Sequence, residues 1–557
     1  MLLFVFASEF KFYLLLPPLL LLAWLRPGWG RTFFDRAEAA VSRLAKRRWL
    51  AVAAVGLTAF AASCVPALIR MPAPKIHDEF SYLLAADTFA HGRLTNPTHP
   101  LWQHFESIHI IQQPSYNSKY PPGQGVALAL GQVLGHPILG VWLSLAVACA
   151  SVCWMLQAWL PARWAFAGGL LMAIHPQIIT WGYNYWGGAV AMTGGALLCG
   201  GMRRIVDTRR AGAWPFGAGL LILANSRPYE GLVLSTSTIA AGIFVIIRAS
   251  GAGGLREVAR QCGLPLFAFS LLTIFSLGFY NYRVTGSPLH MPYSEHVRQY
   301  LVEPIFVGEK FRPEPVYRHR EIREFYVKEE VDLTLARHGF LYRSFKKFQA
   351  QGQNWLWMGL WLPPLLALPW RWRHDLWLRV AAVCLGGQIA ALLAGQGLFP
   401  QYAAPGVALF VLLMVEGLRQ LRLWRRSHGP GLAFTRWLCV LCVLTVPVVW
   451  GRTLAKNAEG WFRDRERVLA QLGAMPGKHL VLMRYALDHN PNREWVFNAA
   501  DLDRAKILWA REMDAEADSR LRAYFHDRTV WVVEPDQPNP QPHPYFPKPS
   551  AAPETGK

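Results

Sequence analysis

Apolar runs separated by short polar or basic stretches repeat along most of the chain, from residue 12 to residue 450. A membrane-crossing helix needs about 20 consecutive apolar residues, and several of these runs approach that length with hardly any charge. The pattern therefore predicts a polytopic α-helical membrane protein with about 12 transmembrane helices. The predicted crossings are residues 12–25, 49–69, 138–159, 165–180, 187–202, 214–224, 232–247, 262–280, 355–370, 376–394, 403–415 and 437–450.

Residues 123–134 form one further apolar run, which is too short for a crossing. A helix of this length spans about 18 Å, whereas the hydrocarbon core of a bilayer is about 30 Å thick. We therefore expect a re-entrant or interfacial helix on the outer face of the membrane. With this assignment, the chain crosses the membrane three times between Lys119, which lies outside, and the basic residues 203–210. An odd number of crossings places these basic residues in the cytoplasm.

Basic residues concentrate beside the apolar runs, as in residues 43–48, 203–210 and 419–426. Such clusters mark cytoplasmic loops, which places the long polar loops 70–122 and 281–353 outside. The second of these loops contains a basic stretch, but loops longer than about 60 residues largely escape the charge rule. The net charge of +21 therefore fits cytoplasmic loops. We predict no nucleic-acid partner, because no recognition motif accompanies the charge.

Changes in composition divide the chain into four parts. The first is an accessory helix with a basic cytoplasmic stretch, and the second is the transmembrane domain. A small extracytoplasmic α/β cap and a proline-rich tail follow. These parts are residues 1–48, 49–452, 453–534 and 535–557.

The cap is predicted from two kinds of local pattern. Residues 479–485 and 529–533 are rich in β-branched and aromatic side chains and predict strands, whereas residues 502–513 have helical periodicity. The tail from Pro535 is rich in proline and is expected to be disordered.

Composition agrees with a membrane protein, because 53% of the residues are hydrophobic and only 17% are charged. The eight cysteines all lie in apolar runs or at their ends. Cys439 and Cys442 have the spacing of a redox or zinc motif, but they stand in an apolar segment without a nearby histidine. We interpret the cysteines as small apolar side chains.

An acidic pair, Asp78-Glu79, closely follows the apolar run 49–69 and opens a segment, residues 80–91, with helical spacing of its apolar residues. The helix dipole favours carboxylates at a helix N-terminus, where they are also held rigidly. One carboxylate is suited to act as general base on an acceptor hydroxyl, and the other to orient the acceptor or a cation. The alternative interpretation is an ordinary acidic pair in a solvated loop.

A transferase that releases a phosphate needs positive charge where negative charge develops. Lys119 and Arg227 are the candidates in the outer segments. Arginine can bind a phosphate through two hydrogen bonds, although a cation that only reaches toward lipid headgroups is the alternative for Arg227. Tyr402 lies in a turn on the outer face, where it can hydrogen-bond the donor or serve as an interfacial aromatic anchor.

Further polar residues of the outer segments are candidates for binding substrate. Tyr82 lies in the helix-like segment after the acidic pair, and His290 and Tyr293 follow the apolar run 262–280. The first long loop is rich in histidine, but the spacing matches no compact zinc ligand set, which favours ordinary polar loop residues. We therefore predict no bound metal, while a divalent cation that assists catalysis stays open. The histidines concerned are His77, His91, His99, His104 and His109.

The acidic pair after an early apolar helix, the long first outer loop and the Lys119-Tyr120-Pro121-Pro122 element resemble the GT-C superfamily of integral-membrane glycosyltransferases. Aminoarabinose transferases and protein O-mannosyltransferases belong to this group. The resemblance covers mainly residues 49–280. It implies that an acid of the first outer loop is the catalytic base, which corresponds to Asp78 with Glu79 beside it.

The resemblance also implies the partners of the reaction. The lysine before the proline pair, Lys119, would contact the donor phosphate. The donor would be a sugar carried by a polyprenyl phosphate, and its anomeric carbon would be inverted. The acceptor would be a glycolipid, a polysaccharide or a protein, on the outer side of the inner membrane.

Two other classes of function compete with this hypothesis. A lipid-linked saccharide transporter or flippase would carry charged residues along a path through its crossings, and the central parts of the runs are nearly uncharged. A non-catalytic envelope assembly protein would use the cap to bind a partner. The leading hypothesis is a glycosyltransferase.

Overall fold

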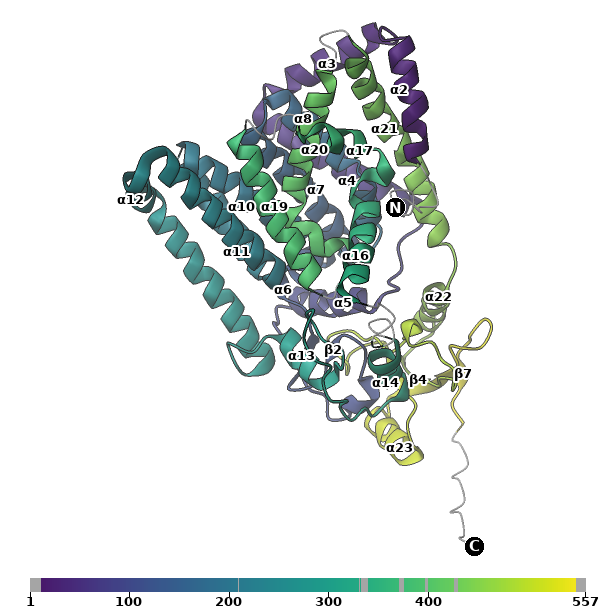
Figure 1. Cartoon of the computed structure of the whole chain (residues 1–557). Helices are drawn as coiled ribbons and strands as arrows, with labels where there is room; N and C mark the ends of the chain where they lie inside the picture. Colours follow the sequence, from purple (N-terminus) through teal and green to yellow (C-terminus); the bar gives the residue numbers. More distant parts are fainter. Residues whose placement is uncertain are drawn as a thin grey trace.

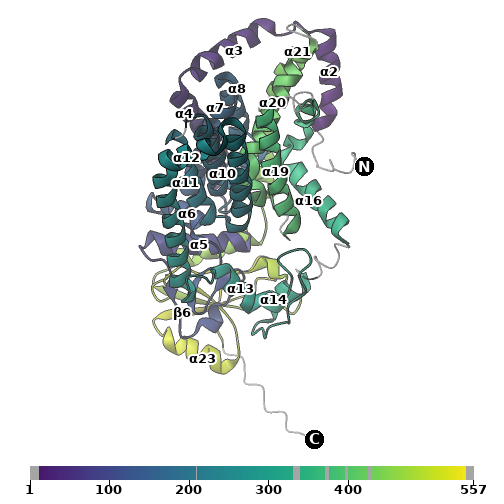
Figure 2. The ribbon, with the colours of Figure 1, turned by 60° about the vertical axis from the view of Figure 1, so that its left-hand side comes forward.

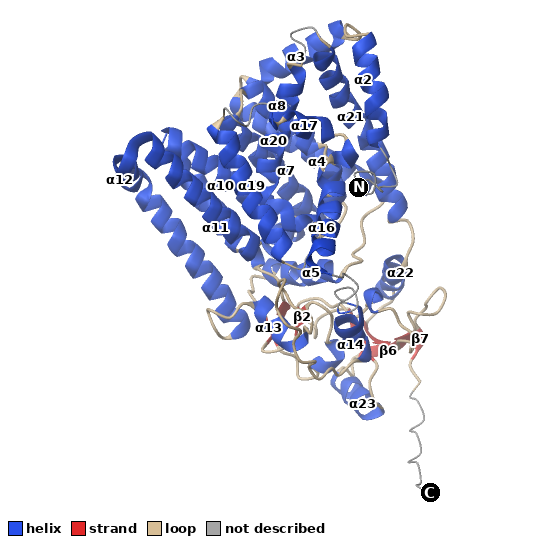
Figure 3. Cartoon of the chain, viewed as in Figure 1, coloured by secondary structure: helices blue, strands red, loops and turns tan. Residues whose placement is uncertain are grey.

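The structure is a computed structural model that describes residues 12–208, 210–329, 331, 339–369, 375–395, 399–424 and 429–546. It is mostly helical, with one group of upright helices and a smaller part at their lower end that contains the strands (Figure 1, Figure 3). Within the described residues, six segments are long and apolar enough to cross a membrane. They are α4 (Arg48–Ile69), α7 (Pro137–Trp159), α12 (Pro228–Thr285), α19 (Leu376–Ala394), η5 with α20 (Pro400–Gly406 and Val407–Arg422) and α21 (Pro430–Lys456).

The longest of these, α12, contains both predicted runs 232–247 and 262–280. Its backbone leaves the helical conformation at Gly251, where φ is 57° and ψ is −158°. A positive φ is accessible to glycine because it has no Cβ. Figure 1 shows that α12 consists of two arms that run in opposite directions.

The predicted twelve crossings are not confirmed. The run 165–180 is divided between α8 (Ala162–Ala173) and α9 (Pro176–Trp181), because a proline lacks the N–H that would continue the first helix. Among its described residues, the run 355–370 contains the end of α16 (Gly339–Trp355) and the short pieces η4 (Trp357–Gly359) and α17 (Leu362–Ala367). The remaining helices of this part are η1 (Phe12–Leu15), α2 (Leu16–Leu25), α3 (Arg31–Ala45), α10 (Ala189–Thr208) and α11 (Arg210–Ala224).

The short apolar run after Lys119 forms α6 (Pro122–Val133), a 12-residue helix that lies against α7. Glycines bring the two backbones together: a Cβ at Gly140 would lie 2.0 Å from the carbonyl oxygen of Ala127. A Cβ at Gly131 would lie 2.2 Å from the nitrogen of Gly140. Small residues allow this close helix packing where apolar surroundings provide no hydrophobic driving force. The packing fixes the position of the chain that leads into α6.

The first long loop is structured around α5 (His77–Ala90), which lies across the lower ends of the upright helices in both views (Figure 1, Figure 2). The loop continues through η2 (Trp102–Phe105) and a three-stranded antiparallel sheet of order β1-β3-β2. Its central strand, β3, pairs Tyr116 with Asn96 and Ser118 with Ile110. The strands are β1 (Asn96–Pro97), β2 (Ile110–Ile111) and β3 (Ser115–Ser118).

The second long loop carries α13 (Pro292–Tyr300), α14 (Arg320–Arg323) and a turn of π-helix, η3 (Glu324–Glu329). After α22 (Trp461–Ala474), the C-terminal residues form a four-stranded sheet of order β5-β4-β6-β7. Strand β4 is parallel to β5 and β6, and β7 is antiparallel to β6. The elements are β4 (Lys478–Met483), β5 (Ile507–Arg511), α23 (Ala515–Tyr524), β6 (Arg528–Val533) and β7 (His543–Pro544).

Two predictions for the C-terminal part are wrong. The predicted helix over residues 502–513 is instead the strand β5, because a short continuous apolar run fits a buried strand as well as a buried helix. The predicted disorder from Pro535 does not begin there, since β7 pairs with β6 and adds an edge to the sheet. The rest of the predicted tail, residues 547–557, lies outside the described residues.

Candidate active site

The acidic pair occupies the first turn of α5, as the sequence predicts. Glu79 is 1% exposed and accepts three backbone N–H groups. One oxygen accepts from Lys75 at 2.8 Å and from Ile76 at 3.1 Å, and the other accepts from Tyr185 at 2.9 Å. Burial raises the pKa of Glu79, and these hydrogen bonds oppose the rise. The side chain thus joins the start of α5 to the chain that leads into α10.

Asp78 has a different environment, although it is the adjacent residue. Its side chain is 17% exposed, and Oδ1 accepts a hydrogen bond from the hydroxyl of Tyr120. Oδ2 lies 3.8 Å from Nδ1 of His109, which is longer than a hydrogen bond. Burial raises the pKa of Tyr120 well above its usual range, so this hydroxyl keeps its proton and donates. Asp78 therefore has a fixed orientation and unused acceptor capacity.

Lys119 reaches this place because it directly follows β3. Ser118, the last residue of the strand, has its hydroxyl 2.8 Å from that of Ser81 on α5. The Nζ atom of Lys119 lies 5.2 Å from the ring centre of Tyr120 and 5.4 Å from that of Tyr293 on α13. These are cation–π distances, and the lysine is buried. The positive charge thus lies one residue from the tyrosine that contacts Asp78.

Arg227 lies at the turn between α11 and α12, with its guanidinium carbon 4.6 Å from the ring centre of Tyr402. Tyr82 stacks on Tyr120 with ring centres 4.4 Å apart. Burial raises the pKa of Tyr82, nearby Arg227 lowers it, and Asp78 and Tyr402 raise it further. The hydroxyl of Tyr82 therefore lies near Asp78 of its own helix and near Arg227 and Tyr402 from two other segments.

Two predicted site residues have their described contacts outside this cluster. Glu79 binds the backbone N–H groups given above, and His290 binds α13. The Nε2 atom of His290 lies 2.8 Å from a carboxylate oxygen of Glu295 on α13, and Arg298 pairs with the same carboxylate. The structure thus brings together the following predicted residues: Asp78, Tyr82, Lys119, Arg227, Tyr293 and Tyr402.

Four of the five histidines of the first loop, namely His77, His99, His104 and His109, are buried and are not the ordinary polar loop residues that the sequence predicts. Two of them, His77 and His109, lie beside Asp78. Their ring centres are 5.8 Å apart, and His109 lies at the same distance from His296 on α13. Burial lowers the pKa of His77 to about 4 and that of His109 well below its usual range. No spacing pattern identifies these residues, because the third ring comes from the second long loop.

A bound metal ion needs several histidine, cysteine or carboxylate side chains that converge on one point. In the part of the chain that the structure describes, no group of three or more such residues is arranged to hold a metal ion. The divalent cation that the sequence left open stays a prediction.

A surface hollow of about 350 Å³ lies on the other face of α5, between this helix and the C-terminal unit. Successive helical residues are 100° apart, so the α5 residues that line it point away from the side that carries Asp78 and Tyr82. Phe497, Asn498 and Ala499 form its opposite wall. The α5 residues are Phe80, Leu83, Leu84 and Asp87. The hollow is separate from the cluster around Asp78.

No protein-family model matches the chain, and no curated protein matches its sequence. The structure is similar to the oligosaccharyltransferase of Archaeoglobus fulgidus in the apo form, with a TM-score of 0.48 and 12% identity over 86% of this chain and 69% of that one. It is also similar to ArnT from Cupriavidus metallidurans bound to undecaprenyl phosphate, with a TM-score of 0.44 and 14% identity over 87% of this chain and 92% of that one.

Proposed function

We propose that the chain is a membrane glycosyltransferase that moves a sugar from a polyprenyl-phosphate donor to an acceptor hydroxyl on the extracytoplasmic side of the inner membrane. One observation carries the proposal. A partly exposed carboxylate, Asp78, lies in one cluster with Arg227 and close to Lys119, at the end of helices long enough to cross a bilayer. A lipid-carried donor needs a base and a phosphate-binding cation at this level of the membrane.

In the proposed reaction, Asp78 is the general base. It takes the proton of the acceptor hydroxyl as that oxygen forms a bond to the anomeric carbon of the sugar. The bond from this carbon to the phosphate oxygen breaks, and the electron pair leaves with the polyprenyl phosphate. Because attack and departure occur on opposite faces, the anomeric carbon is inverted.

Arg227 and Lys119 would stabilise the negative charge that develops on the leaving phosphate. Both lie against tyrosine rings, Arg227 against Tyr402 and Lys119 against Tyr120 and Tyr293. A cation held on an aromatic face loses little side-chain freedom when the phosphate arrives. The hydroxyls of Tyr402 and Tyr293 are suited to hydrogen-bond the donor, whereas that of Tyr120 already donates to Asp78.

Glu79 does not share the role of base in this proposal. Its two oxygens are occupied by three backbone N–H groups, and it is almost fully buried. We assign it to holding the N-terminus of α5, and therefore Asp78, in place. The general-base role belongs to Asp78 alone.

The test is the substitution Asp78→Asn, with mass analysis of envelope glycolipids and glycoproteins from cells that express the wild type, the variant or no chain. The amide keeps the shape of the side chain but cannot act as base, and loss of a general base costs roughly 10²- to 10⁴-fold in rate. We expect a chain-dependent mass increment that the variant fails to produce at wild-type abundance. Retained transfer in Asp78→Asn would remove this residue from the mechanism.

A further inference from the structure

We propose that His109 is a positioning residue for the Asp78 carboxylate and that Tyr326, from the second long loop, holds His109 in place. The inference rests on the proposed function, because it assigns the support of the base in that reaction. His109 faces Oδ2 of Asp78 at 3.8 Å, while Tyr120 donates to Oδ1. The two oxygens of the carboxylate are therefore approached by two different residues.

The backbone of His109 is held at both of its polar atoms. Its N–H donates to the hydroxyl of Tyr326 at 3.2 Å, and its carbonyl oxygen accepts from the hydroxyl of Ser81 at 2.7 Å. The residue has a φ of 64°, in the left-handed region, where a residue other than glycine is uncommon. Such backbone conformations persist where the surroundings determine them, and they concentrate at functional sites. Ser81 lies one helical turn after Asp78, so the same helix carries the base and one support of His109.

Tyr326 links this arrangement to the second long loop. Its hydroxyl lies 2.9 Å from Nε2 of His296 as well as accepting from His109. Tyr326 belongs to a buried cluster of the second loop that also includes Ile108, the residue before His109. The first loop therefore depends on the second for the position of one backbone N–H beside Asp78.

The ring of His109 is surrounded by groups that keep it neutral. Burial has the largest effect on its pKa, followed by the positive charge of Lys119 and the neighbouring rings of His77 and His296. Phe325 closes one side, with ring centres 5.7 Å apart. A neutral imidazole beside Asp78 can donate a hydrogen bond without cancelling the charge that makes the carboxylate a base.

The present distance between Nδ1 of His109 and Oδ2 of Asp78 is too long for a hydrogen bond. Hydrogen bonds in catalytic sites are often long without substrate and shorten in the substrate complex. Nδ1 of His109 is buried and makes no other hydrogen bond within the described residues. Nδ1 is therefore available to donate to Oδ2 of Asp78 when this distance shortens in the substrate complex.

The experiment uses the full-length chain in membranes, with polyprenyl-phosphate sugars extracted from the same cells as the donor probe. Initial rates of the chain-dependent transfer are measured by mass spectrometry at increasing concentrations of this extract. The variants are His109→Ala, His109→Asn and Tyr326→Phe. Asparagine tolerates the left-handed backbone, and its side-chain amide N–H can replace that of Nδ1.

The matched control is Tyr317→Phe. It removes a hydroxyl from the same aromatic cluster of the second loop, but that hydroxyl donates to the carbonyl oxygen of Tyr300, whereas the hydroxyl of Tyr326 accepts from His109. Asp78→Asn is measured alongside, because retained transfer in that variant overturns the proposed function and this inference together.

In His109→Ala we expect kcat to fall about 10- to 100-fold with little change in the apparent KM for the donor extract, because a misplaced reacting group slows the chemical step. His109→Asn should recover part of this loss, and Tyr326→Phe should be slower than Tyr317→Phe. Wild-type kcat in both His109→Ala and Tyr326→Phe overturns the inference, even where Asp78→Asn is inactive. A loss in His109→Ala that only follows reduced abundance, without recovery in His109→Asn, also overturns it.

Discussion

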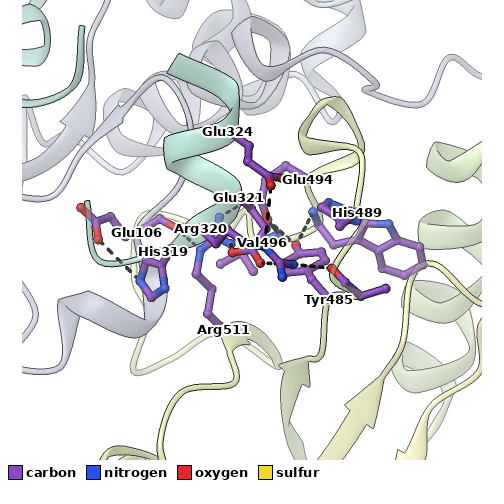
Figure 4. A network of polar contacts seen from close by, with 12 residues as sticks. Glu106, His319, Arg320, Glu321, Glu324, Tyr485, His489, Glu494, Val496 and Arg511 are labelled. Carbon is purple, nitrogen blue, oxygen red and sulfur yellow. Dashed lines mark hydrogen bonds and ion pairs between the residues drawn. The ribbon is translucent and has the colours of Figure 1, made fainter. Parts of the chain in front are cut away.

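Two groups of charged residues on the same side of the molecule differ in how fully their charges are paired. Around Arg511, at the end of β5, each of the three guanidinium nitrogens has a partner. Its Nε donates to the carbonyl oxygen of Glu106 at 2.8 Å, Nη2 pairs with Glu494, and Nη1 lies 3.4 Å from Glu321 (Figure 4). Glu494 also accepts from the hydroxyl of Tyr485. Arg511 is 1% exposed, so this network has almost no contact with water.

Asp78 has one hydroxyl donor, an imidazole beyond hydrogen-bond distance and a partly exposed side chain. The contrast separates two uses of charge. A fully paired buried ion fixes the segments that contribute to it, because moving any one of them leaves a charge buried without a partner. A carboxylate with unused acceptor capacity can receive a proton from a substrate. Glu79 belongs with Arg511 in this comparison, although it is adjacent to Asp78.

The Arg511 network also connects distant parts of the chain. It joins three segments that are distant in the sequence: the first long loop through Glu106, the second through Glu321 on α14, and the C-terminal unit through Glu494 (Figure 4). Glu106 in turn accepts from the hydroxyl of Tyr300 at 2.8 Å, at the end of α13. Helix α13 carries Tyr293 and His296 of the candidate site, so the C-terminal unit supports that site indirectly.

The largest expected effect on stability is that of Arg511→Met. The substitution leaves Glu494 buried without its cation, which typically costs about 3–5 kcal/mol. Arg520→Met is the matched control, because Arg520 lies in the same unit and pairs with Glu516 on α23, and both side chains are exposed. We expect at most about 1 kcal/mol there. Thermal unfolding of the purified chain measures both, and equal losses would contradict the distinction between the two arginines.

The next largest effect is a dependence of the stability on pH, which comes from the lowered pKa of His77. Its pKa is about 4 in the folded chain and 6.5 in the unfolded chain, so between these values the unfolded chain binds the proton and the folded chain does not. Stability therefore falls as pH decreases from 6.5 to 4, by up to about 3 kcal/mol. His77→Phe should weaken this fall while keeping the ring contact with Phe325. Unfolding temperatures of both chains between about pH 7 and pH 4 test it, and parallel curves would refute the assignment.

The smallest effect is expected for Glu79→Gln. The amide has one acceptor oxygen, so at least one of the backbone N–H groups of Lys75, Ile76 and Tyr185 loses its partner, at a cost of about 1–3 kcal/mol. Transfer per folded molecule should stay within a few-fold of wild type, in contrast to Asp78→Asn. If Glu79→Gln abolished transfer without lowering the unfolding temperature, Glu79 would belong to the chemistry and the comparison would fail.

Local patterns alone identified several elements of this structure. The apolar run 376–394 has the same bounds as α19, and the run 49–69 differs from α4 by one residue. The short run 123–134 is the 12-residue helix α6, and the acidic pair stands in the first turn of α5. These features depend on side-chain periodicity and on capping within a few residues, which the sequence contains directly.

Other features depend on residues far apart in the chain, and only the tertiary structure decided them. Asp78 and Glu79 have different hydrogen-bond partners because Tyr120 and Tyr185 come from distant segments, and the backbone of His109 binds Tyr326 of the second long loop. Strand β5 is a strand because β4 pairs with it. In the sequence, the adjacent acids Asp78 and Glu79 look equivalent. Their chemistry diverges when distant segments bring hydrogen-bond partners to one position and leave the other open to substrate.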